Sequence, residues 1–173
     1  VYRRLGFLPG FEIDRWERRG LPASSAAAAR AGAASTSAGI PRPATAADLD
    51  ALVALDRAAT GLDRRLLLDS FLRRPDTRAW LAGDGRGFVV ARAGRRATQI
   101  GPLAAPDDAR AIALLDIAIA TASDDPARAI FLDLPRAHRP VAEALERLGF
   151  VRLGYRSMGA GQVEEDRPGR VIG

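Results

Sequence analysis

The tetrapeptide Arg147-Leu148-Gly149-Phe150 occurs twice in the sequence, the first time as Arg4-Leu5-Gly6-Phe7. The two copies are 143 residues apart (150 minus 7). In each copy a glycine follows an apolar helical turn and an aromatic residue follows the glycine, which is the pattern of a helix that ends and passes into a strand. The spacing is the length of one small domain, so the sequence predicts one domain preceded by the tail of another.

Composition limits the chemistry that this chain can perform. Its 173 residues, 47% hydrophobic and 27% charged, are enough for one well-buried core. Cysteine is absent and histidine occurs once, which excludes disulfides, thiolate nucleophiles and zinc sites based on cysteine, and predicts no metal site. The sequence shows no apolar run long enough to cross a bilayer and no secretory signal, so we expect no membrane partner and a cytoplasmic location.

All 26 basic residues are arginines, and the net charge is +5. A basic balance attracts phosphates, whether of a nucleic acid or of a nucleotide cofactor. The arginines are scattered, acidic residues often lie beside them, and few aromatic residues lie among them. This distribution argues against a nucleic-acid groove and favours a solvated basic surface.

The first forty residues divide into a strand and a linker. Apolar residues alternate, or nearly so, from Phe11 to Trp16, which predicts a strand. Between Gly20 and Gly39 the sequence is almost entirely Ala, Ser, Gly and Thr, without a periodic apolar face, and this composition predicts a linker. We therefore divide the chain into the tail of a preceding domain (1–16), a linker (17–39), a main domain (40–158) and a C-terminal tail (159–173).

The main domain combines helical and strand patterns in a fixed order. Thr45 and Asp48 form a capping box before the first helix, and Asp84-Gly85 between apolar runs indicates a hairpin. The predicted elements are helices over 45–60 and 63–74, strands over 77–82, 87–93 and 97–104, a helix from 107, a strand over 129–134, a helix over 138–148 and a strand over 151–157. This order predicts an α/β fold with a mixed sheet, in which an antiparallel meander is followed by a β-α-β-α-β segment.

The order of elements, with the Arg-Leu-Gly-Phe corner after the last helix, resembles the GNAT acyltransferase superfamily, whose members transfer an acyl group from acyl-coenzyme A to an amine. The resemblance covers about residues 40–158. Residues 2–16 look like the end of another GNAT domain, and three segments resemble the C-terminal domain of tandem bacterial acetyltransferases: 56–65, 100–103 and 133–135. The resemblance implies acetyl-CoA as co-substrate, a small-molecule amine as acceptor, and contact with a preceding GNAT domain of the same polypeptide.

In this family the cofactor lies in a V-shaped gap between two parallel strands, here 97–104 and 130–134, and backbone N–H groups at the start of the long helix bind its pyrophosphate. The resemblance gives this role to Leu103, Ala104, Ala105, Asp108 and Ala109. The loop nevertheless departs from the family pattern, because it contains no glycine and carries two carboxylates. Aspartate at a helix start is ordinarily a cap, and a cap competes with phosphate for the same N–H groups. The sequence thus predicts a degenerate cofactor site.

Three residues are candidates for proton transfer. The family's general acid is a tyrosine two residues before the arginine of the corner, a position that Tyr2 occupies in the first copy and Leu145, which cannot donate a proton, in the second. His138 replaces the asparagine that often begins the last helix, and it serves in catalysis, caps the helix or faces solvent. Tyr155 lies on the last strand, where its hydroxyl reaches the gap or belongs to the surface or the core.

These observations leave three functions open. In the first, the protein is an N-acyltransferase and this second domain is a degenerate copy that supports the first domain. In the second, this domain is itself active and binds its cofactor through a shortened loop. In the third, the domain is a binding or assembly module without a cofactor, whose sheet edge pairs with a partner through Phe11 to Trp16. An open gap favours the second function, whereas a gap filled by side chains such as Phe131 favours the others. We also expect the strand from Phe11 to Trp16 to pair with or pack on the main domain.

Overall fold

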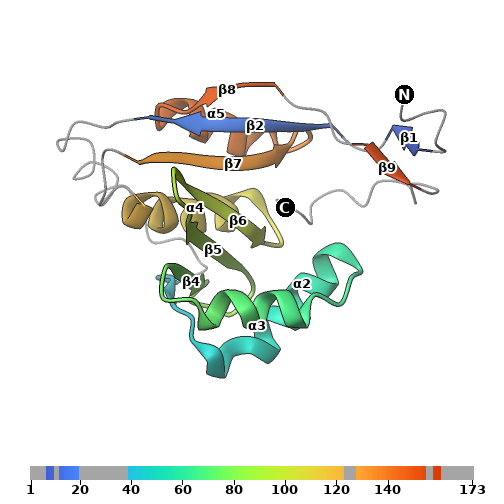
Figure 1. Ribbon diagram of the computed structural model, residues 1–173, viewed down its shortest axis with the longest axis vertical. Coiled ribbons are helices and arrows are strands. Elements are labelled where there is room, and N and C mark those ends of the chain that lie inside the picture. The colour runs from blue at the N-terminus through green and yellow to red at the C-terminus, as the bar shows by residue number, and fades with distance from the viewer. Residues whose placement is uncertain (1–6, 10–11, 20–38, 123–127, 155–157, 161–173) are drawn as a thin grey trace.

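The computed structural model describes residues 7–9, 12–19, 39–122, 128–154 and 158–160 of the chain. Their centre is a seven-stranded sheet with the strand order β3-β4-β5-β6-β7-β2-β8 (Figure 1). All neighbouring strands are antiparallel except β6 and β7, which are parallel. The strands are β2 (Ile13–Arg18), β3 (Arg42–Pro43), β4 (Thr77–Leu81), β5 (Phe88–Ala93), β6 (Ala97–Ala104), β7 (Ala129–Pro135) and β8 (Val151–Arg152).

Helices cover both faces of the sheet. The helical elements are η2 (Ala46–Asp48), α2 (Leu49–Thr60), α3 (Arg65–Arg73), α4 (Asp108–Ala122) and α5 (Arg139–Arg147). In Figure 1, α4 and α5 lie behind the strands and α3 lies in front of them. One buried cluster joins α4 and α5 to the sheet, and a second joins α2 and α3 to β4, β5 and the end of β6. The face toward α2 and α3 is called the α3 face below.

Most predicted elements are confirmed. The meander, the long helix and the last helix lie where the sequence places them. The capping box is present, because Thr45 Oγ1 accepts a hydrogen bond from the Ala47 N–H and Asp48 from the Thr45 N–H. Gly61, which ends the first predicted helix, has a φ of 74°, a left-handed value that favours glycine.

The N-terminal strand lies inside the sheet of the main domain. Residues Ile13 to Trp16 pair antiparallel with β7, which confirms the expected pairing for that part of the segment, and Phe11 lies outside the described residues. The predicted linker begins too early, because Glu17 and Arg18 still belong to β2. Both are buried, and the Arg18 guanidinium lies 5.1 Å from the Phe150 ring, so packing extends the strand beyond its alternating apolar pattern.

The C-terminal region differs from the prediction. The strand expected over 151–157 is seen only as Val151–Arg152, and residues 155–157 lie outside the described part of the chain. Met158–Ala160, of which the last two residues were predicted to be tail, form strand β9. This strand pairs antiparallel with β1 (Phe7–Pro9) in a separate two-stranded ladder.

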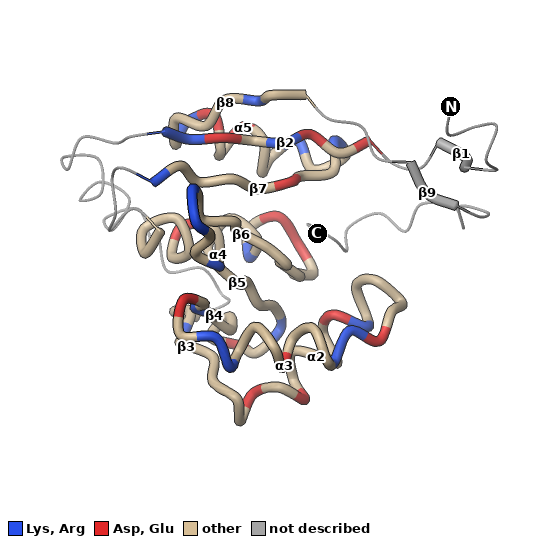
Figure 2. Tube along the Cα trace, viewed as in Figure 1, with Lys and Arg blue, Asp and Glu red and all other residues tan. Residues whose placement is uncertain are grey.

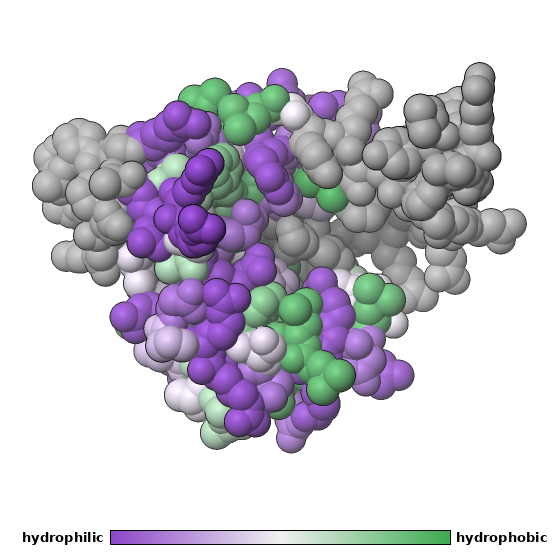
Figure 3. Space-filling view, in the orientation of Figure 1, coloured by the Kyte–Doolittle hydropathy of each residue, from purple (hydrophilic) through white to green (hydrophobic). Residues whose placement is uncertain are grey.

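Charged and apolar side chains are distributed differently over the surface. Arginines and acidic residues are interspersed along the described elements (Figure 2). Several of them form ion pairs, such as Arg15–Asp133, Arg64–Asp56 and Arg110–Asp84. Apolar side chains gather over the helices α2 and α3 and over β8 (Figure 3). The exposed ones on the helical side are Leu62, Leu66 and Leu67, and those near β8 are Val151 and Leu153. In the described part of the chain, the helices are too short or too polar to cross a membrane.

Candidate functional site

The two parallel strands separate part-way along their length. Residues Ala97–Ile100 of β6 pair with Ala129–Leu132 of β7, and among the described residues the pairing stops there. On the other side of β6, the register with β5 shifts, so that Gly101 and Pro102 together lie opposite Val90. Such a bulge bends its strand, and the φ of 134° at Gly101 is one that glycine tolerates. The V-shaped gap predicted between these strands is therefore present beyond Ile100.

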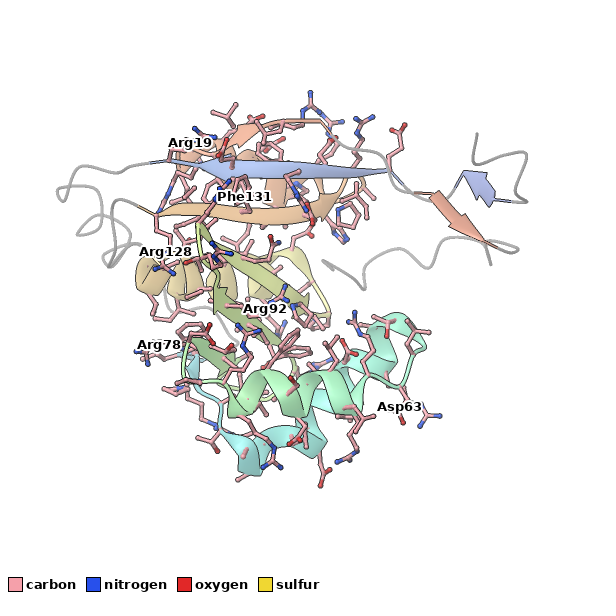
Figure 4. The ribbon with its side chains drawn as sticks, in the orientation of Figure 1. Arg19, Asp63, Arg78, Arg92, Arg128 and Phe131 are labelled. Carbon is pink, nitrogen blue, oxygen red and sulfur yellow. The ribbon has the colours of Figure 1, made fainter. Side chains whose placement is uncertain are left out.

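A row of half-buried and buried side chains crosses the α3 face beside this gap. Arg92 of β5 lies opposite Gln99 of β6, Gln99 opposite Phe131 of β7, and Phe131 opposite Glu17 of β2. Directly opposed residues of neighbouring strands point to the same face, so these four side chains form one row. Phe131 belongs to the paired part of β7, before the strands separate. Figure 4 labels Arg92 and Phe131 on this face.

The carboxylates near the row are paired with arginines. Arg15 donates from Nε and Nη2 to the two oxygens of Asp133, at 2.8 and 2.9 Å. The same guanidinium lies 6.0 Å from the Phe131 ring. Glu17 accepts a hydrogen bond from Arg19 Nε at 2.5 Å. These carboxylates are acceptors held in place, and each has a basic partner on β2 or at its end.

A second cluster lies where β2 begins and β7 ends. Arg136 donates to both oxygens of buried Asp14 at 2.8 Å and pairs with Glu12, while Arg152 lies 3.4 Å from Asp14. The hydrogen bond from Arg136, opposed by burial and assisted by both positive charges, lowers the pKa of Asp14 below its ordinary value of 3.8. Asp14 is therefore ionised near neutral pH and fastens the start of β2 to the loop after β7.

Arg92 has a different environment. Its Nε donates to the carbonyl oxygen of Gly101 at 3.0 Å, and its guanidinium lies 4.5 Å from the ring of Phe71 on α3. Burial, and then the positive charge of Arg74, lower the pKa of Arg92 from its ordinary value. The residue remains charged, but its charge is partly removed from water.

The first turn of α4 is closed by carboxylates. Asp107 Oδ1 accepts a hydrogen bond from the Arg110 N–H at 2.8 Å, which is the geometry of an N-cap. The Arg110 guanidinium pairs with Asp107 and, at 2.7 and 2.9 Å, with Asp84 of the turn between β4 and β5. The prediction that aspartate caps this helix is confirmed, and Asp107 is the residue that does so.

His138 faces the same turn. It occupies the N-cap position of α5 but makes no side-chain cap hydrogen bond, so a capping role is wrong. Its Nδ1 lies 3.2 Å from Asp108 Oδ1, and its side chain is 14% exposed, so it does not face solvent either. His138 therefore joins the start of α5 to the start of α4.

The structure brings some of the predicted site residues together. Leu103 and Ala104 are buried at the end of β6, and Ala105, Asp108 and Ala109 follow at the start of α4, within one short segment that His138 contacts. Tyr2 and Tyr155 lie outside the described residues. Sequence reasoning missed the row from Arg92 to Glu17, because only the order of the strands reveals it. Within the described ranges, no three histidine or acidic side chains are placed to hold a metal ion.

Comparison with known proteins gives a family and a fold. Residues 52–160 match the family model of the acetyltransferase (GNAT) domain. No curated protein matches the sequence.

Three solved structures resemble the chain. A putative acetyltransferase from Pyrococcus horikoshii has a TM-score of 0.68 and 19% identity, over 98% of this chain and 52% of that one. A GCN5-related N-acetyltransferase from Kribbella flavida has a TM-score of 0.54 and 24% identity, over 78% of this chain and 33% of that one. A GCN5-related N-acetyltransferase from Sphaerobacter thermophilus has a TM-score of 0.57 and 16% identity, over 94% of this chain and 56% of that one. The chain thus spans about half, or less, of these proteins, and the likeness is one of fold.

Proposed function

Because the chain belongs to the GNAT acetyltransferase family, we propose that its protein transfers an acetyl group from acetyl-CoA to the amine of a small molecule. We propose also that the domain seen here is a degenerate copy that supports this reaction without binding the cofactor's pyrophosphate. The family membership and the gap between β6 and β7 support the first statement. The capped start of α4 supports the second, and it is the observation on which the proposal rests.

The start of α4 is poorly suited to a pyrophosphate for two reasons. A helix binds an anion at its N-terminus through N–H groups that have no other acceptor and through the positive end of its dipole. Here Asp107 already accepts from the Arg110 N–H, and Asp108 places a second carboxylate on the same turn. Arg110, the nearest cation, is matched by Asp84 and Asp107. A pyrophosphate would meet repulsion where the family fold normally attracts it.

Calorimetric titration with acetyl-CoA tests this part of the proposal. The unmodified chain should show no measurable binding, and the variant Asp107→Ala/Asp108→Gly should gain it, because the N–H groups of the first turn are then free. Removing two negative charges also raises the general attraction for anions. The control is therefore Glu143→Gln/Glu146→Gln, which makes the same change of charge on exposed positions of α5 and should gain nothing.

Tight binding by the unmodified chain would contradict the proposal and identify a second active acyltransferase domain. If neither the unmodified chain nor the variant binds acetyl-CoA, freeing the first turn of α4 is not enough to restore the site. The shortened loop between β6 and α4 would then be a further reason why the site is degenerate. This result would favour the remaining alternative, a cofactor-independent binding or assembly module with the GNAT fold.

The crossed pairing of the terminal strands supports a tandem arrangement, in which a GNAT-type repeat precedes this one. In each copy of the repeated corner, one strand follows at once and a second comes after it: β1 and β2 in the first copy, β8 and β9 in the second. The pairs formed are β2 with β8 and β9 with β1, so each copy gives its second strand to the other.

The registers of the two ladders agree to within one residue. Glu17 of the first copy lies opposite Val151 of the second copy. The residue equivalent to Glu17 in the second copy is Ala160 (17 plus 143), and the residue equivalent to Val151 in the first copy is Leu8 (151 minus 143). Equal registers would therefore place Ala160 opposite Leu8. Ala160 in fact lies opposite Phe7. A ladder of two three-residue strands is marginal alone, so β1 and β9 need a further strand. A strand of the preceding repeat, equivalent to β7, would supply it.

A protease site engineered within residues 20–38 of the longer polypeptide tests the tandem proposal. After cleavage the two parts should elute together in gel filtration and separate only when the protein is unfolded. The reason is that β2 remains in the sheet of the second repeat and β9 remains in the sheet of the first repeat. An uncleaved sample treated in the same way is the control. Separation of the two parts under native conditions would show that the strands are not exchanged.

A further inference from the structure

Arg92 is a partly desolvated cation that no carboxylate of the described residues contacts. The half-buried arginines Arg15, Arg64 and Arg110 each pair with a carboxylate. Among the residues that the structure describes, none supplies a carboxylate to Arg92, whose contacts are the Gly101 carbonyl and the Phe71 ring. Besides burial, the positive charge of a second cation, Arg74, lowers the pKa of Arg92. A charge removed from water costs free energy unless an opposite charge meets it.

The fold fixes the position of this cation. Nε is engaged by the carbonyl of Gly101, and the ring of Phe71 holds the guanidinium from the side of α3. The two Nη groups therefore remain available for a planar bidentate contact, the geometry in which arginine binds a carboxylate. The site is thus oriented before any ligand arrives.

Arg92 also lies beside the gap. Gly101, which its Nε contacts, is the first residue of β6 beyond the parallel pairing with β7. In the same row, Gln99 lies on the strand next to Arg92, and Phe131 lies one strand further away, on β7. Figure 4 labels Arg92 and Phe131. Adjacent strands are about 4.8 Å apart, so a ligand held at Arg92 that reaches Phe131 spans about 10 Å.

We propose that Arg92 binds the carboxylate of a small ligand that lies on the α3 face with its body toward Gln99 and Phe131. If the proposed acyl transfer holds, the ligand is the acceptor, an amine that also carries a carboxylate, and only this identification depends on the proposed function. Anion binding at Arg92 does not require acetyl-CoA, so its test is separate from the calorimetric titration above.

Benzoate, with benzamide as its uncharged counterpart, is the probe. We expect benzoate to shift the Nε–H resonance of Arg92 in NMR spectra and to raise the melting temperature, because a ligand that binds only the folded state stabilises it. Benzamide should do neither. Inorganic phosphate, titrated in the same way, distinguishes a phosphate site from a carboxylate site.

Arg92→Met is the decisive variant. Methionine keeps the apolar contact with Phe71 while removing the charge, so the variant should fold with nearly unchanged or higher stability, as expected for an unmatched charge. Its affinity for benzoate should fall at least about tenfold, since a charge-assisted hydrogen-bonded contact is lost. Arg92→Gln serves as a second, polar variant. The matched control is Arg78→Gln, an exposed arginine on neighbouring β4 whose substitution removes the same charge and should leave binding unchanged (Figure 4).

Three results would overturn the inference. They are a benzoate response that survives in Arg92→Met, an equal response to benzamide, and no response to benzoate in the unmodified chain. Tighter binding of phosphate than of benzoate, lost in Arg92→Met, would overturn the assignment to a carboxylate.

Discussion

Replacing Asp56 by alanine is expected to lower the free energy of unfolding by about 3–5 kcal/mol, the cost of breaking a buried ion pair from one side. Asp56 lies on α2 and is 1% exposed. Arg64, after the end of that helix, donates from Nε to Asp56 Oδ2 at 2.8 Å and from Nη2 to the other oxygen. The Arg64 side chain is 27% exposed, so part of its charge is rehydrated when the partner is lost. We therefore expect the lower part of the range.

Urea unfolding of Asp56→Ala, Arg64→Ala and the double variant measures the coupling between the two residues. The matched control is Asp69→Ala, which removes the carboxylate of the surface pair Asp69–Arg73 four residues apart on α3. Such exposed pairs contribute about 0.3–0.5 kcal/mol. Equal losses for Asp56→Ala and Asp69→Ala would show that the buried pair does not hold α2 to the start of α3.

Trp16→Ala is expected to cost about 3–5 kcal/mol, as large-to-small substitutions of aromatic core residues do. Trp16 is 3% exposed and lies on β2 between β7 and β8, in the same buried cluster as α4 and α5. Its loss opens a cavity beside a strand that is paired on both sides rather than beside an edge strand. A residue of the N-terminal segment would thus determine the stability of a core otherwise built from residues after 79.

Trp16→Phe separates packing from hydrogen bonding. The indole Nε1 of Trp16 is buried and has no hydrogen-bond partner in the described part of the chain, so phenylalanine removes volume but no hydrogen bond. We expect a smaller loss than for alanine, measured by the same urea titration. Leu66→Ala, at a position that is 87% exposed, is the control and should change stability by less than about 0.5 kcal/mol. A loss below about 1 kcal/mol for Trp16→Ala would contradict the insertion of β2 into the sheet.

The sequence predicts the local elements better than their arrangement. The hairpin at Asp84-Gly85 and the cap at the start of α4 depend on a few neighbouring residues, so they are legible in the sequence. The place of β2 is not, because Trp16 pairs with Leu132 and Arg152, residues from the opposite end of the chain. Alternation predicts that the segment is a strand and needs covering, but it does not name the neighbours.

The candidate site was predicted in part for the same reason. The separation of β6 and β7 followed from the family resemblance, and Asp107 from the chemistry of caps. Arg92 gave no signal, since an arginine within a strand indicates a solvated side chain unless the residues opposite it are known. Its unmatched charge becomes visible only when Phe71 and Gly101 are placed around it.

The position of β2 also has a consequence for synthesis on the ribosome. The Arg15–Asp133 pair joins residues 118 positions apart, so β2 is made long before either of its neighbours. At translation rates of about 5 to 20 residues per second the strand waits roughly 6 to 24 s for β7, with the apolar side of Trp16 uncovered. The nascent chain therefore carries β2 unpaired until β7 has been made, and this part of the sheet cannot close before then.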